Sequence, residues 1–161
     1  MKEITLKEWS AYLPYGLICE VKDQGRIEID TLFGVYDSKE LLFHNIVEFY
    51  QGFESVKPIL YDLSWLKRDE FREEILIYFN SLGIDAEIVI YDSGNDIEND
   101  FTLLVNYRLM GETFTDALIN KGSTEETPRR FFEWLCKNHF NVFNLPDELI
   151  VRVTEDFNPY K

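Results

Sequence analysis

The chain has 161 residues and a mass of 19.1 kDa, a length that predicts one globular domain over residues 1–161. Its 16 basic and 30 acidic residues give a formal net charge of −14. This charge disfavours direct binding to nucleic acid and adsorption to an anionic membrane, because both need a basic surface. No stretch has the apolar run of a secretory signal or of a membrane helix, so we expect a cytoplasmic protein.

The first predicted element is a short helix that begins after Thr5. Thr5 and Glu8 have the spacing of a capping box, in which each side chain bonds the backbone amide of the other residue. Trp9 and Tyr12 give the helix an apolar side. Pro14 ends it, because proline disfavours helical geometry in the residue before it.

Two stretches of alternating residues then predict a β-hairpin over Leu17–Val21 and Arg26–Phe33. Gly25 suits the left-handed position of a three-residue loop between them. In the second stretch two sets of residues alternate along the strand. One set is Ile27, Ile29, Thr31 and Phe33, and the other is Glu28, Asp30 and Leu32.

The middle of the chain is less regular. Residues Leu41–Tyr50 fit either a buried strand with a bend or one amphipathic helix, and periodicity leaves both open. Residues Phe53–Tyr61 predict a strand, and Pro58 predicts that this strand is an edge strand or has a bulge, because proline lacks the amide donor.

A principal helix is predicted over Ser64–Leu82, with Ser64 as its cap and Gly83 as the residue that terminates it. Its apolar face is formed by residues at helical spacing: Phe71, Ile75, Tyr78, Phe79 and Leu82. Strands are predicted over Ala86–Tyr91, Phe101–Met110 and Leu149–Val153, while Glu112–Asn120 fits a strand or a helical turn.

A second principal helix is predicted over Pro128–Asn141, where Thr127 precedes a proline at the first helical position. Phe131, Leu135 and His139 fall on its apolar side. Together these elements predict an α+β fold: a single domain with a mainly antiparallel sheet of about five to seven strands and two principal helices packed on it.

The loop between Asp92 and Asp100 is rich in oxygen ligands, but it lacks the calcium-loop pattern. The third, sixth and twelfth positions from Asp92 are Gly94, Ile97 and Leu103, where the pattern needs Asp or Asn, Gly and Glu. We therefore predict a solvated loop and no metal or other cofactor.

The chain has two cysteines, Cys19 and Cys136, and two histidines, His44 and His139. We interpret both cysteines as reduced thiols of the core in a cytoplasmic protein. The i, i+3 spacing of Cys136 and His139 on the second helix favours side-by-side packing over a nucleophilic pair. No residue is predicted to be catalytic or to bind a cofactor.

Two features suggest partner binding. Trp134 lies away from the apolar side of the second helix, so it either packs under another element or is an exposed anchor for a partner. The segment 84–126 holds ten acidic residues against Arg108 and Lys121, a net −8. Its loop residues Asp92, Asp96, Glu98 and Asp100 either form a solvated face or imitate nucleic-acid phosphates to a basic protein.

Four segments of the chain carry a resemblance to a known family: Tyr15–Leu17, Val56–Ser64, Phe132–Leu135 and His139–Leu145. In this order they resemble a family of uncharacterised proteins from phages, prophages and genomes of Bacteroides and related bacteria. The resemblance implies an origin in a mobile element and a cytoplasmic setting. It implies no activity, cofactor or catalytic residue.

The leading hypothesis for function is a non-catalytic acidic accessory protein of a phage or other mobile element. It would act by binding a host or phage protein, in one version as a mimic of nucleic acid. The alternative is a small metal-dependent hydrolase or transferase whose acidic residues form the metal site.

Overall fold

The structure is a computed structural model that describes residues 3–23, 25–36, 40–45, 51–92, 101–109, 112–119 and 129–161. The chain divides into two compact units, a first unit of Met1–Asp62 with Glu133–Lys161 and a second unit of Leu63–Phe132. The α+β class is confirmed, with helices and mainly antiparallel strands, but the described strands form two sheets instead of one. That the chain is a single domain stays a prediction.

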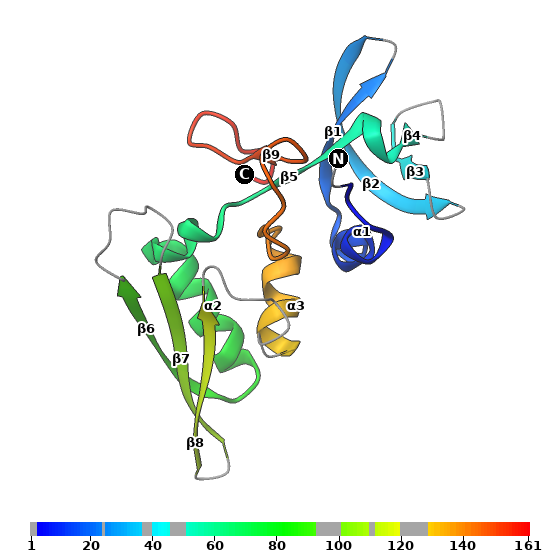
Figure 1. Cartoon of the computed structure of the whole chain (residues 1–161). Coiled ribbons are helices and arrows are strands. Elements are labelled where there is room, and N and C mark those ends of the chain that lie inside the picture. Colours follow the sequence, from blue (N-terminus) through cyan, green and yellow to red (C-terminus); the bar gives the residue numbers. More distant parts are fainter. Residues whose placement is uncertain are drawn as a thin grey trace. The chain divides into compact units, whose positions relative to one another are not determined.

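The first unit contains a six-stranded sheet in the order β4-β3-β2-β1-β5-β9 (Figure 1). All neighbouring strands are antiparallel except β5 and β9, which are parallel. The strands are β1 (Ile18–Asp23), β2 (Arg26–Tyr36), β3 (Glu40–Phe43), β4 (Gln51–Gly52), β5 (Val56–Leu60) and β9 (Val151–Arg152).

Helix α1 (Leu6–Tyr12) forms as predicted, with both hydrogen bonds of the capping box. The Thr5 amide donates to Glu8 Oε2 at 2.6 Å, and the Glu8 amide donates to Thr5 Oγ1 at 3.4 Å. Trp9 and Tyr12 are buried, and a 3₁₀ turn over Leu13–Tyr15 leads to Gly16 at a φ of 68°. The chain then enters β1.

The predicted hairpin is confirmed as β1 and β2, with Gly25 in the left-handed region at a φ of 81°. Cys19 pairs with Asp30, and since paired residues lie on the same face, Asp30 is directed inward with Cys19. The inner face of the hairpin is buried and includes Leu17, Cys19, Val21, Asp30 and Leu32.

The prediction that Pro58 marks an edge strand or a bulge is wrong. Strand β5 is an interior strand, and its pairing with β1 is regular through Cys19↔Pro58. Proline is tolerated because pairing with β9 begins only at Ile59, so no strand needs an amide donor from Pro58 on that side.

Of the two interpretations of Leu41–Tyr50, the strand is confirmed for Leu41–Phe43, which belong to β3. His44 and Asn45 form a bend, so one continuous helix is excluded. Residues 46–50 lie outside the described residues.

In the second unit, the prediction that Ser64 caps the first principal helix is wrong. A 3₁₀ helix spans Leu63–Lys67, and α2 begins at Asp69 and ends at Ser81. Trp65 and Leu66 are buried, and the guanidinium of Arg68 lies 3.4 Å from the centroid of the Trp65 ring. These contacts fix the 3₁₀ turn as a separate element.

The end of α2 is as predicted. Gly83 has a φ of 73°, its amide donates to Asn80 O at 2.9 Å, and the Ile84 amide donates to Phe79 O at 3.1 Å. These two bonds form a Schellman motif, which needs a residue that tolerates the left-handed conformation. Of the predicted apolar face, Phe71, Ile75 and Phe79 are buried, Tyr78 is half-buried and Leu82 is exposed.

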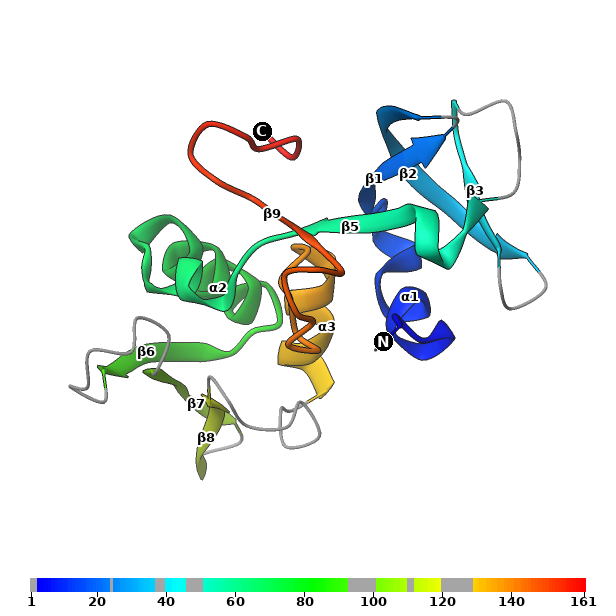
Figure 2. The same cartoon turned by 45° about the horizontal axis from the view of Figure 1, so that its top comes forward.

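The other elements of the second unit form an antiparallel sheet in the order β6-β7-β8, and α2 lies against β6 (Figure 2). The strands are β6 (Asp85–Asp92), β7 (Phe101–Leu109) and β8 (Glu112–Ile119). Residues 112–119 are therefore a strand, not a helical turn.

Helix α3 (Arg129–Lys137) is shorter than the predicted Pro128–Asn141. The predicted end at Asn141 is wrong, because His139 takes a φ of 59°, which a right-handed helix cannot continue through. Thr127 and Pro128 lie outside the described residues. The final strand is confirmed as β9, reduced to Val151–Arg152.

Candidate functional site

The outward face of β2 is apolar and exposed. Ile27, Ile29 and Phe33 have exposed fractions of 64%, 45% and 63%. They lie on one side of the strand because residues two apart share a face. We call these three residues the β2 outer face. On β1, Lys22 pairs with Ile27 and Glu20 pairs with Ile29, so charged side chains of both signs border it.

A β-bulge lies at Phe33, at one end of this face. Leu32 pairs with Phe43 and Gly34 pairs with Leu42, so Phe33 is the extra residue of β2. A Cβ atom on Gly34 would lie 3.3 Å from Leu42 Cδ1, so glycine leaves room for the Leu42 side chain here.

The ring of Phe33 has one aromatic neighbour among the described residues. The imidazole of His44 stands edge-on to it, with centroids 5.1 Å apart and an interplanar angle of 67°. The His44 amide donates to Thr31 O at 3.3 Å, which keeps the end of β3 beside the bulge. Phe33 is thus an exposed aromatic side chain held from one side.

Asp30 is the buried charged residue behind this face, with an exposed fraction of 4%. Its Oδ2 accepts from the Asn45 amide at 2.7 Å, and its Oδ1 accepts from Asn45 Nδ2 at 2.9 Å and from the Thr31 amide at 2.7 Å. Three hydrogen bonds satisfy a carboxylate that would otherwise be costly to bury. They also tie the bend after β3 to β2.

Trp134 is buried, with an exposed fraction of 5%, and it stacks on Phe140 with centroids 5.9 Å apart. Trp134 therefore packs inside the protein, which was one of the two predicted alternatives. The other alternative, an exposed anchor for a partner, is wrong. The reason is that α3 ends at Lys137, which lets Phe140 fold back onto the helix.

The acidic loop residues Asp96, Glu98 and Asp100 lie outside the described residues, and Asp92 is described only as the last backbone residue of β6. Their part in partner binding stays a prediction. Acidic charge is not confined to that loop: the first unit has 9 basic and 16 acidic residues and the second has 7 and 14, a net −7 in each.

Cys19 and Cys136 are buried free thiols, as predicted. Burial, with Glu133 nearby, raises the pKa of Cys136 to about 12, and burial with Asp30 nearby raises the pKa of Cys19. Both thiols therefore stay protonated and unreactive at neutral pH.

The prediction that His139 shares the second helix with Cys136 is wrong, because His139 lies beyond the end of α3, whereas its packing beside the Cys136 thiol stays a prediction. Its Nε2 is 2.9 Å from Tyr15 O, and its ring stacks on Tyr160 with centroids 4.2 Å apart and 9° between planes. Burial lowers the pKa of His139, so the neutral imidazole donates to Tyr15 O. This histidine links the 3₁₀ turn after α1 to the C-terminal segment.

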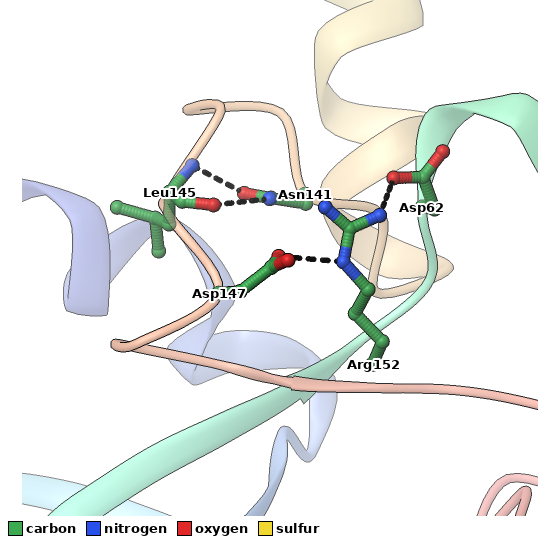
Figure 3. A network of polar contacts seen from close by, with 5 residues as sticks. All are labelled: Asp62, Asn141, Leu145, Asp147 and Arg152. Atoms are coloured by element: carbon green, nitrogen blue, oxygen red, sulfur yellow. Dashed lines mark hydrogen bonds and ion pairs between the residues drawn. The ribbon is translucent and has the colours of Figure 1, made fainter. Parts of the chain in front are cut away.

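A group of polar contacts involves the loop after α3, with Asn141, Leu145 and Asp147, and the side chains of Asp62 and Arg152 (Figure 3). Asn141 is buried; its Oδ1 accepts from the Leu145 amide at 2.8 Å and its Nδ2 donates to Leu145 O at 2.9 Å. Arg152 donates through Nε to Asp147 Oδ1 at 2.6 Å and pairs through Nη1 with Asp62. The network fixes the loop after α3 and explains why Asn suits position 141.

Within the described ranges, no three His, Cys, Asp or Glu side chains form a group that could hold a metal ion. No helix in the described part of the chain has the length and apolar character needed to cross a membrane. No protein-family model, no curated protein and no solved structure matches the chain. The β2 outer face was not found from the sequence, although its alternating residues were the available signal.

Proposed function

We propose that the chain is a non-catalytic acidic accessory protein of a phage or other mobile element that binds a basic partner protein through the β2 outer face. The carrying observation is the exposure of Ile27, Ile29 and Phe33 on one side of β2. Exposed apolar side chains that lie together are typical of interaction sites.

The charge of the molecule supports a basic partner. Each unit has a net charge of −7, so the field around the β2 outer face is negative at long range. A second copy of this chain would carry the same charge and be repelled. A partner with Lys and Arg around an apolar centre would be attracted and could bury the three side chains.

The mobile-element setting is supported by the resemblance in Tyr15–Leu17, Val56–Ser64, Phe132–Leu135 and His139–Leu145. A cytoplasmic setting is supported by the two buried free thiols, since disulfides form in oxidising compartments.

The test is capture of a partner from a lysate of the host, followed by calorimetric titration of the purified partner. The variant Ile27→Ser/Ile29→Ser/Phe33→Ser should bind at least about tenfold more weakly, since interface anchors contribute about 2 kcal/mol or more. The control is Ile77→Ser, which changes an equally exposed isoleucine, 66% exposed, on α2. Equal binding by wild type and the triple variant would contradict the proposal.

Salt gives a second readout. The association rate should fall steeply as ionic strength rises, because attraction between separated charges is screened over about 8 Å at physiological salt. A partner that is acidic, or that binds at the same rate in high salt, would refute the assignment of a basic partner.

A further inference from the structure

The bulge, Phe33 and Asp30 form one local structure, and of these three features the proposed function uses only Phe33. We infer that Phe33 is the anchor residue of the β2 outer face and that Asp30 is its positioning residue, acting through Asn45 and His44. This inference rests on the proposed function and names the residues that set the affinity of the same surface.

Phe33 is suited to be an anchor by its position and its type. As the extra residue of the bulge it has no paired residue on β3, and the residue is 63% exposed. Aromatic residues are enriched at protein interfaces because they bury a large rigid area at a small cost in conformational entropy. Ile27 and Ile29 continue the apolar surface on the same side of β2.

Asp30 determines what lies beside Phe33. Its carboxylate is buried and accepts from both the amide and the Nδ2 of Asn45, so the bend of His44 and Asn45 is fixed relative to β2. The imidazole of His44 then contacts the Phe33 ring from one side. A side chain restricted before binding loses less entropy when the partner binds, which raises affinity.

Proton NMR of the two histidines tests the positioning role without a partner. In the wild type, the ring current of Phe33 should shift the His44 ring protons from the values of an unfolded peptide. Phe33→Leu should abolish this shift and Asp30→Asn should reduce it, while His139 signals should stay unchanged. His44→Gln assigns the signals.

Asn45→Ala is a milder variant, because it removes only the Nδ2 donor, and it should reduce the His44 shift less than Asp30→Asn. It also keeps the test valid if Asp30→Asn fails to fold. His44 signals at wild-type positions in folded Asp30→Asn, or in Asn45→Ala where the former does not fold, would refute the positioning role.

The anchor role is tested with the protein captured by the wild-type chain as the probe. Phe33→Leu should weaken its binding at least tenfold and Asp30→Asn at least threefold, with Ile77→Ser as the unchanged control. If Ile27→Ser/Ile29→Ser abolishes binding while Phe33→Leu binds like wild type, Phe33 is not the anchor and the proposed function stands. If none of these variants weakens binding, or the wild type captures nothing, the proposed function is wrong. The positioning role of Asp30 is then tested by the NMR result alone.

Discussion

Replacing Tyr160 with Phe removes one hydroxyl group that bridges two strands of the first unit. The hydroxyl donates to Ile59 O at 2.6 Å and accepts from the Ile18 amide at 3.3 Å. Ile18 and Ile59 would be the next pair after Cys19↔Pro58, where the register between β1 and β5 stops. The hydroxyl therefore links the two strands where their direct pairing ends.

The size of the effect follows from these two bonds. Each is expected to contribute about 1 kcal/mol net, and a buried group left unsatisfied costs about 1–3 kcal/mol. Ile59 is fully buried, so its carbonyl would lose its partner without access to water, whereas Ile18 is half-buried. We expect Tyr160→Phe to lower the free energy of unfolding by about 2 kcal/mol.

Urea unfolding followed by circular dichroism and tryptophan fluorescence measures this loss. The matched control is Tyr15→Phe, because the Tyr15 hydroxyl has no hydrogen bond to the described residues; it should change stability by less than about 0.5 kcal/mol. A loss below about 0.5 kcal/mol in Tyr160→Phe would show that the hydroxyl does not link the strands as the structure indicates.

Three other variants test particular contacts. Burial lowers the pKa of His139 below its usual value of 6.5, so the unfolded chain binds the proton more readily and stability should fall as pH drops through about 6.5. The urea midpoint of His139→Asn should therefore fall less than that of the wild type between about pH 7.5 and 5.5. An equal fall in both proteins would contradict the lowered pKa of His139. Asn141→Ala removes both bonds to Leu145 and should lower the free energy of unfolding in urea by about 2–3 kcal/mol. An unchanged urea midpoint would contradict this. Gly83→Ala forces a side chain into the left-handed region and should cost about 1–2 kcal/mol, whereas Ser81→Ala in the last turn should cost less; equal costs would argue against the Schellman motif.

Elements with strong local signals were predicted correctly. The capping box at Thr5 and the left-handed Gly25 and Gly83 each depend on residues within one turn of the chain, so short-range chemistry determines them. The free, buried cysteines were predicted for the same kind of reason, from composition and spacing alone.

Boundaries that depend on distant contacts were predicted incorrectly. Ser64 has the chemistry of a helix cap, but the burial of Trp65 and Leu66 places it inside a 3₁₀ turn. His139 fits the periodicity of α3, but its ring is held by Tyr15 and Tyr160, which are 124 and 21 positions away in the sequence. No local pattern contains these partners.

The β2 outer face shows a conflict between pattern and pairing. Alternation alone would favour burial of Ile27, Ile29 and Phe33 on one side of β2. The pairing of Cys19 with Asp30 instead places that side outward and buries a carboxylate, which then needs Asn45 as a partner. A sequence selected only for stability would not retain both an exposed apolar set and a buried charge on one strand, since each is unfavourable by itself. Such departures from local consistency are expected at functional sites. The exposed apolar residues and the buried carboxylate on β2 therefore support a binding role for this face.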